Sequence, residues 1–228
     1  DAEDHPEWCA RNKDGSFIFN SPLKEDELGY EQLPYYHWKF MCINNEYHSL
    51  IYEQIKDCND QEVPVILDNG CGTGSSSLWL AAQNPNAIVF GIDRSVNFIK
   101  INKYENIVFA QVEISQLWRL LWEKKVQISK AFLFYPNPWP KSKHLTRRWH
   151  AHPAFKYLID ITNSLELRTN WELYALEAQA SLEFMTDNRT SLSKFKPNHS
   201  ISLHEDKYMK SGHDLFKLVS SKYFSTQS

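Results

Sequence analysis

Glycines gather in one short stretch of the chain, and their spacing indicates a ligand-binding loop. Three of the seven glycines, Gly70, Gly72 and Gly74, directly follow the apolar run 63–69 and precede a segment with helical character. Such a density between a strand and a helix indicates unusual backbone torsions and close approach to a ligand. The amino end of the following helix favours an anionic group such as a carboxylate or a phosphate. The spacing departs from the dinucleotide fingerprint, and no lysine follows as in a phosphate loop.

Carboxylate side chains lie at or near the ends of the segments that have strand character. Asp93 closes the apolar run 87–93, where a carboxylate can accept hydrogen bonds from both hydroxyls of a ribose; alternatively, it is a turn residue at the strand end. Asp68 is placed to receive an ammonium group, and Glu113 could approach an adenine, although Val112 competes for that position. An adenosine-type ligand is indicated. S-adenosylmethionine fits best, because its methionine carboxylate would meet the glycine loop and its ribose would meet Asp93.

A second stretch whose residues could take part in binding or catalysis follows the apolar run 131–135. Three prolines within residues 136–140 exclude both a helix and continued strand pairing, so Asn137 and Trp139 would be held rigidly at a strand end. Ligands of open α/β sheets bind at this edge. The cationic or titratable side chains that follow are Lys141, Lys143, His144, Arg147, Arg148 and His150. The pattern suggests a reactive group presented to something anionic; the alternative is a proline-broken edge strand with a solvated basic loop.

Strand-like and helix-like segments alternate through most of the chain. Strands are predicted at 63–69, 87–93, 106–112, 131–135 and 165–169. Helices are predicted over 75–83, 95–103, 114–125, 153–164 and 171–186. Two further strand-like pieces, 200–204 and 214–220, suit an antiparallel edge. The alternation predicts an α/β fold, namely a Rossmann-like, doubly wound, mostly parallel sheet with an antiparallel C-terminal edge.

Length and composition narrow the class of protein. The 228 residues suit one domain, which we place at residues 59–228, with residues 1–58 as an N-terminal extension packed on it. A net charge of −3 argues against a general nucleic-acid coat protein, so positive charge would have to be local, as in residues 141–150. The four cysteines show no CxxC spacing, which favours free thiols in a reducing cytoplasm. No apolar run approaches the roughly 20 residues of a membrane span.

A metal site is the weaker alternative for the basic stretch. His144, His150 and His152 cluster in the sequence, but no carboxylate or cysteine completes a recognisable ligand set. We therefore expect no metal.

The two stretches resemble the bacterial tRNA (guanine-N7)-methyltransferase family. DNGCGTG at 68–74, with GID at 91–93, is similar to the family's acidic, glycine-rich first motif. FYPNPWPKSKHLTRR at 134–148 is similar to its signature PDPWPKKRHHKRR. The segment 169–174 looks like the family's T-D-W-x-x-Y, and 202–207 lies where the family has T-x-F-E-x-R.

This resemblance, which covers about residues 60–222, implies a class I S-adenosylmethionine-dependent methyltransferase fold and methyl transfer to N7 of a guanine in tRNA. The implied cofactor-binding residues are Asp68, Gly70, Gly72 and Asp93, joined by Gly74 of the same loop and by Glu113. The implied base pocket comprises Asn137, Asn170 and Glu205 as catalytic residues, with Thr169 and Ser202. The implied tRNA phosphate contacts are Lys141, Lys143, His144, Arg147 and Arg148. A monomer or a homodimer is expected.

The chain departs from the family pattern inside the base pocket. Two family aspartates are Asn137 and Asn170 here, and Ser202 replaces a threonine. An asparagine carbonyl still accepts a hydrogen bond, but it brings no negative charge, and charged hydrogen bonds exceed neutral ones by roughly 1 kcal/mol each. We therefore predict intact cofactor binding and a weakened base pocket. The family's glycine turn before 165–169 is also missing. The sequence therefore leaves open how the far edge of the sheet is arranged.

Two other functions stay open at this point. One is a methyltransferase that acts on another RNA site or on a small molecule. The other is a catalytically silent homologue that binds tRNA.

Overall fold

The computed structural model describes residues 10–11, 17–18, 45–95, 104–186 and 190–222. The chain divides into two compact units, residues 1–37 and residues 38–228. In the smaller unit, the two-residue strands β1 (Ala10–Arg11) and β2 (Phe17–Ile18) pair antiparallel. All further description concerns the larger unit.

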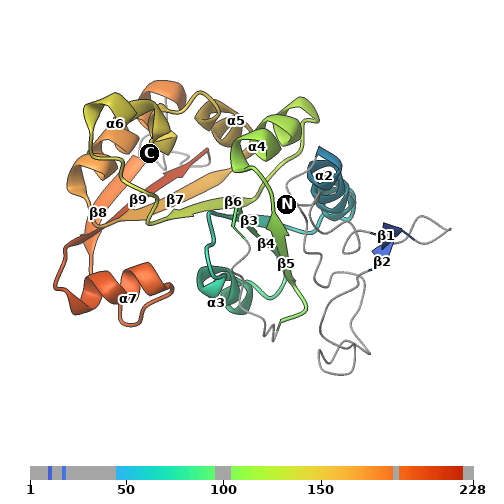
Figure 1. The fold of residues 1–228 in the computed structure, drawn as a ribbon, viewed down its shortest axis with the longest axis horizontal. Helices are drawn as coiled ribbons and strands as arrows, with labels where there is room; N and C mark the ends of the chain where they lie inside the picture. The colour runs from blue at the N-terminus through green and yellow to red at the C-terminus, as the bar shows by residue number, and fades with distance from the viewer. Residues whose placement is uncertain (1–9, 12–16, 19–44, 96–103, 187–189, 223–228) are drawn as a thin grey trace, which may run out of the picture. The chain divides into compact units, whose positions relative to one another are not determined.

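A seven-stranded sheet forms the centre of the larger unit, in the order β5-β4-β3-β6-β7-β9-β8 (Figure 1). Its strands are β3 (Val65–Asn69), β4 (Ile88–Asp93), β5 (Ile107–Gln111), β6 (Lys130–Phe134), β7 (Ser164–Thr169), β8 (Thr190–Phe195) and β9 (Leu215–Ser221). The pairings among β3 to β7 are parallel, whereas β9 pairs antiparallel with both β7 and β8. The predicted α/β fold with an antiparallel C-terminal edge is confirmed.

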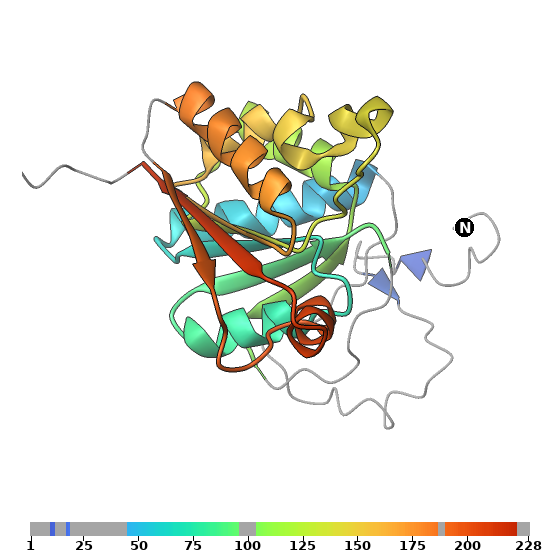
Figure 2. The same ribbon diagram turned by 90° about the vertical axis from the view of Figure 1, so that its left-hand side faces the viewer.

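Helices cover both faces of this sheet (Figure 2). One face carries α2 (Asn45–Asp60), α4 (Ile114–Glu123), α5 (Phe155–Ile161) and α6 (Glu172–Thr186), and the other carries α3 (Ser75–Gln83) and α7 (Leu203–Lys210). The first face buries the larger apolar core, which includes Trp118 and Phe155. The second face buries a smaller core around Leu80 and Phe109. Parallel strands covered on both faces explain the near-continuous apolar runs of the sequence.

Helix α2 belongs to the larger unit, although it falls within the expected extension 1–58. Ile51, Ile55 and Cys58 lie on one side of the helix and are buried in the core. The spacing of three and four residues between them is that of an amphipathic helix with one face against a sheet. Residues 19–44 lie outside the described residues, and so does the predicted helix 95–103 apart from its first residue.

The predicted strand at 200–204 is wrong. Ser202 is the N-cap of α7, and its Oγ accepts a hydrogen bond from the Glu205 N–H at 3.1 Å. The spacing of Ser202 and Glu205 is that of a helix-start capping box, a signal that could have identified this helix. The outermost strand, on the far side of β9 from β7, is instead β8. Its mostly polar residues carry little hydrophobic signal because it is a half-exposed edge strand.

The short link before β7 does not disturb the far edge of the sheet. Only Thr162 and Asn163 separate α5 from β7. The Asn163 N–H donates to the Ile128 carbonyl, and the Lys222 N–H donates to the Asn163 carbonyl, both at 2.9 Å. Neighbouring backbone groups therefore hold the link without the family's glycine turn.

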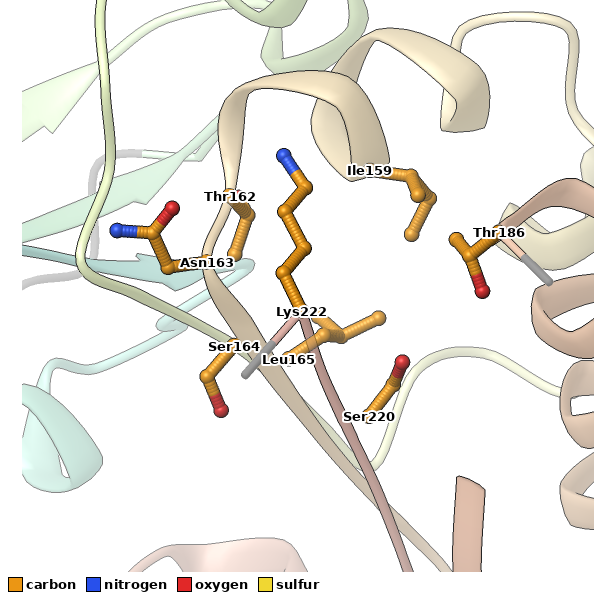
Figure 3. A pocket seen from close by; sticks show the side chains of 8 residues that line it. All are labelled: Ile159, Thr162, Asn163, Ser164, Leu165, Thr186, Ser220 and Lys222. Atoms are coloured by element: carbon orange, nitrogen blue, oxygen red, sulfur yellow. The ribbon is translucent and has the colours of Figure 1, made fainter. Parts of the chain in front are cut away.

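A small cavity lies beside this link (Figure 3). Its volume of about 10 Å³ has room for one water molecule, and its lining includes Thr162, Ser220 and Lys222. It lies at the amino end of β7, the edge opposite the loops that follow the strands. Among the described residues, no helix has the length and apolar character needed to cross a membrane.

Candidate active site

The glycine loop follows β3 and is tied to the neighbouring strand β4. The φ angles of Gly70, Gly72 and Gly74 are 76°, 57° and 87°, in the left-handed region that favours glycine. The N–H groups of Gly70 and Cys71 both donate to the Ile92 carbonyl, at 2.8 and 3.1 Å. A Cβ atom added at Gly70 or Gly72 would meet no atom within 4 Å. The loop thus presents an open backbone surface at the sheet edge.

Gly74 is packed more tightly than Gly70 and Gly72. We expect the substitution Gly74→Ala to lower the free energy of unfolding by about 2–4 kcal/mol. A Cβ atom there would lie 2.6 Å from Cε1 of Phe109, in addition to the strain of the positive φ. Urea unfolding measures the loss. Gly212→Ala is the matched control, because Gly212 has a φ of 69° but open space around it. Equal losses in the two variants would show that the contact with Phe109 does not matter.

Asp68 is buried beneath the glycine loop. Its Oδ2 accepts hydrogen bonds from the hydroxyls of Ser76 and Ser77 in the first turn of α3, both at 2.6 Å. Its Oδ1 is buried and has no partner among the described residues. Burial raises the pKa of the Asp68 carboxyl to about 6, against the opposing effect of the two hydroxyls. A buried carboxylate oxygen without a partner is poised to accept from a donor that enters the site.

Asp93 holds the glycine loop from the end of β4. One carboxylate oxygen accepts from the Gly72 N–H at 2.8 Å, and the other accepts from the N–H and the hydroxyl of Ser95, both at 2.8 Å. Asp93 therefore acts as a turn residue at the strand end, which is the alternative that the sequence left open. The side chain is half-buried, and the oxygen hydrogen-bonded to Gly72 keeps one lone pair for a further donor.

Glu113 lies at the start of α4, next along the sheet edge. Its Oε1 accepts from the Ser115 hydroxyl at 3.1 Å, and its carbonyl contacts Nε2 of His48 at 3.1 Å. Val112 is fully buried, and its N–H donates to the Asp93 carbonyl at 3.0 Å. Val112 therefore packs in the core, and Glu113 is the residue left at the edge.

The turn after β6 presents Asn137. Tyr135 and Trp139 flank it with φ angles of 51° and 44°, which are rare for residues other than glycine. The Tyr135 N–H donates to the Arg168 carbonyl at 2.8 Å, which fixes the first bend to β7. Asn137 is exposed, and its Oδ1 contacts the Trp139 N–H at 3.4 Å. Strained backbone of this kind clusters at functional sites.

The basic segment continues into the 3-10 helix η2 (Ser142–Arg147). Exposed or half-exposed here are Lys141, Lys143, His144 and Arg147. The Arg147 guanidinium lies 4.8 Å from the centre of the Trp139 ring. Lys141 and Lys143 form no ion pair within the described part of the chain, so both ammonium groups can bind an anion.

Arg148 differs from the other cations because it is only 4% exposed. Its Nε and Nη2 donate to the Trp139 carbonyl at 3.3 and 3.2 Å, and its Nη1 pairs with the Glu177 carboxylate. Its guanidinium also lies 4.9 Å from the Trp171 ring. The expected contact with a tRNA phosphate does not fit this burial, since every part of the guanidinium already has a protein partner.

The end of β7 supplies Thr169 and Asn170. The pairing of Phe134 with Arg168 sets the ends of β6 and β7 side by side, so the loops that carry Asn137 and Asn170 are neighbours. Thr169 is buried and its Oγ1 accepts from the Trp171 N–H at 3.2 Å. Asn170 is half-buried, with its Nδ2 3.0 Å from Nδ1 of His213.

Glu205 is fully buried, which does not fit its expected direct contact with the substrate. Its Oε2 accepts from the Tyr135 hydroxyl at 2.5 Å and from Arg168 Nη1 at 3.2 Å. Its Oε1 accepts from the Ile201 N–H at 3.3 Å. Burial, and then the Glu205 carboxylate, raise the pKa of Tyr135 well above its usual range. Glu205 therefore ties α7 to β6 and β7, and Ser202 caps the same helix.

The three clustered histidines do not converge. His150 contacts Glu177, His144 lies edge-on to Trp139, and His152 packs against Trp149. Within the ranges that the structure describes, no three His, Cys, Asp or Glu side chains are arranged to hold a metal ion.

Sequence reasoning missed the side chains that hold the site together, namely Ser76, Ser77, Ser95, Tyr135, Arg168, Glu177 and His213. The serine triplet 75–77 at a helix start was a usable signal, because hydroxyls there can reach a strand-end carboxylate. Glu177 gave no signal, since one glutamate in a helix normally faces solvent.

Known proteins similar to this chain are methyltransferases. The model of the family described as "Putative methyltransferase" matches residues 62–218. A tRNA (guanine-N(7)-)-methyltransferase of Mycoplasma genitalium is 27% identical over 191 residues, which cover 75% of this chain and 90% of the relative. A protein of the same name from Cereibacter sphaeroides is 37% identical over 93 residues, 38% of each chain. A solved structure described as an antibiotic-related methyltransferase shares the fold with a TM-score of 0.54 at 17% identity, over 75% of this chain and 93% of that chain.

Proposed function

The chain belongs to this methyltransferase family, whose model matches residues 62–218, and we propose that it transfers a methyl group from S-adenosylmethionine to N7 of a guanine in tRNA. Two relatives described above carry the name of that activity. The strand order with one antiparallel strand near the C-terminal edge is that of class I methyltransferases. A tRNA substrate would place the reaction in the cytoplasm.

The residues around the glycine loop fit S-adenosylmethionine, which when bound supplies an electrophilic methyl group. The free Oδ1 of Asp68 is suited to the ammonium of the methionine part, because it is a buried acceptor that lacks a donor. The open backbone at Gly70 and Gly72 suits the carboxylate, and the remaining lone pair of Asp93 suits a ribose hydroxyl. Glu113, at the edge beyond β5, would lie toward the adenine.

Methylation at N7 makes modest chemical demands on the protein. Guanine N7 has a lone pair and no proton, so no general base is needed, and positioning with electrostatic stabilisation suffices. Asn137 and Asn170 are the groups at neighbouring strand ends that would accept hydrogen bonds from the Watson–Crick edge of the base. Glu205 would act indirectly, without contacting the base, because it fixes Tyr135 at the start of the turn that carries Asn137.

The observation that carries the tRNA assignment is the exposed basic surface beside the glycine loop. Lys141, Lys143 and Arg147 follow β6, and the loop follows β3, the strand next to β6. A methyltransferase for a small uncharged substrate would have little use for these cations there, whereas a phosphate backbone would.

Calorimetry with S-adenosylmethionine is the first test of this function. We expect binding with one site per chain. No binding would refute the enzyme and leave a tRNA-binding homologue, and binding without methyl transfer to RNA would indicate a different substrate.

The tRNA contact predicts the behaviour of the double variant Lys141→Ala and Lys143→Ala. We expect its affinity for tRNA to fall about tenfold at physiological salt, with the slope of log K against log salt reduced by about 1 per lost phosphate contact. Filter binding across a salt series measures both. Lys124→Ala with Lys130→Ala is the matched control, because these exposed lysines follow α4 and begin β6 at the opposite edge. An equal loss in the control pair would mean that the basic turn is not the tRNA surface.

A further inference from the structure

The buried Arg148 lies between the two segments of the proposed base pocket. Its guanidinium donates to the backbone carbonyl of Trp139, two residues after Asn137. The same guanidinium lies over the ring of Trp171, the residue after Asn170. One side chain thus contacts both the turn after β6 and the start of α6.

Glu177 fixes this arginine in place from the second turn of α6. Its Oε2 pairs with Arg148 Nη1 and also lies 3.1 Å from Nε2 of His150. Arg148 and His150 are 4% and 3% exposed, whereas the Glu177 side chain is 31% exposed, so both contacts lie at the edge of the buried region. Charge-assisted hydrogen bonds of this kind are among the strong ones. We call Glu177, Arg148 and His150 the Glu177 clamp.

His150 is the second side chain that contacts the Glu177 carboxylate. Burial, helped by the nearby Arg148, lowers the pKa of His150 against the opposing effect of the Glu177 carboxylate, so the imidazole is neutral at pH 7. A neutral imidazole facing a carboxylate donates from Nε2, which leaves Nδ1 as a bare acceptor. Nδ1 is buried without a partner among the described residues. One carboxylate oxygen therefore serves two donors, which a neutral amide oxygen would do more weakly.

We propose that Glu177 is a positioning residue for the proposed methyl transfer, because through Arg148 it fixes the turn that carries Asn137 relative to the helix start that carries Asn170. Neither Glu177 nor Arg148 needs to touch tRNA or cofactor for this role. The inference rests on the proposed function. The positioning role also explains why Arg148 of the signature is turned inward while Arg147 beside it stays exposed.

The test compares Glu177→Gln with Glu183→Gln, a matched change on the same helix whose carboxylate contacts Gln179 and Thr190 instead. We expect Glu177→Gln to lower kcat for tRNA about tenfold or more, as displacement of reacting groups does, while the Kd for S-adenosylmethionine changes less than twofold. Amide exchange in residues 142–147 should accelerate in this variant alone. Glu177→Asp, which keeps the charge, should recover part of kcat. This variant tests the proposal if Glu177→Gln folds poorly.

The outcomes separate the clamp from the function it serves. A kcat and an exchange rate for Glu177→Gln equal to those of the wild type would overturn the proposal, and so would an equal loss in Glu183→Gln. Faster exchange with unchanged kcat would also overturn it, because the clamp would then be structural only. A wild type that does not methylate tRNA would instead reject the proposed function, whatever the exchange measurement shows.

Discussion

Asp68→Asn is expected to weaken the binding of S-adenosylmethionine roughly a hundredfold. The Asp68 carboxylate is buried, and its free Oδ1 is the acceptor we assign to the ammonium of the cofactor. Losing one partner of a buried charge pair costs about 2–5 kcal/mol, and 1.4 kcal/mol corresponds to tenfold in affinity. Isothermal titration calorimetry at pH 7.5 measures the change. An affinity within threefold of the wild type would remove Asp68 from the cofactor site.

The same carboxylate predicts how binding depends on pH. The pKa of Asp68 is raised to about 6 in the free protein, so below that pH the group is protonated and must lose its proton to receive an ammonium. We expect the affinity of the wild type to fall about tenfold for each pH unit below 6. Asp68→Asn should show no such fall over the same range.

Stability provides the control for misfolding of this variant. A carboxyl whose pKa is raised on folding stabilises the protein at low pH, and this contribution is lost as the pH rises from about 4 through about 6. The wild type therefore carries an unfavourable buried charge at pH 7. Asp68→Asn removes that charge and should melt no lower than the wild type at pH 7. Weak binding by a variant that is also unstable would not support the assignment.

The double substitution Asn137→Asp and Asn170→Asp is expected to raise kcat for tRNA about ten- to a hundredfold. The methylated base becomes cationic, and a carboxylate stabilises that charge better than an amide by roughly 1 kcal/mol for each hydrogen bond. The two residues follow adjacent strands, one exposed and one half-buried, so the base can reach both. Steady-state kinetics with saturating tRNA measures the effect.

Added negative charge alone must be excluded as the cause of any change. Gln83→Glu with Asn86→Asp adds the same charge at exposed positions, at and just after the carboxyl end of α3, which lies at the opposite sheet edge. This control should leave kcat unchanged. An unchanged or lower kcat in the Asn137 and Asn170 double variant would reject the weakened pocket.

The parts of the fold with strong local patterns were predictable from the sequence. The runs ending at Asn69, Asp93 and Phe134 are apolar because both of their faces are covered, and the glycine loop stands between a strand and a helix. β8 was missed because an edge strand needs few apolar residues. The helix that begins at Leu203 could not be told from a strand by its apolar residues, because Ile201 and Leu203 alternate with polar ones, and only the capping signal of Ser202 and Glu205 marks it.

The types of the candidate site residues could be predicted from the sequence, but the directions in which their side chains point could not. The sequence placed Asp68, Asp93 and Asn137 at strand ends, where the structure has them. It could not show that Arg148 turns inward, because that depends on Glu177, 29 residues further along the chain. Glu205 likewise reads as a reactive carboxylate until its distant partners Tyr135 and Arg168 are known. Burial of a charge is a property of tertiary packing and has no local signature.

Nucleoside mapping tests the central claim most directly. Purified protein would be incubated with S-adenosylmethionine and tRNA that lacks 7-methylguanosine, and the products would be digested and analysed by mass spectrometry. We predict 7-methylguanosine at one guanine position, formed at a rate that the double substitution increases. A methyl group on another atom, or no methylated nucleoside from a protein that binds the cofactor, would contradict the account.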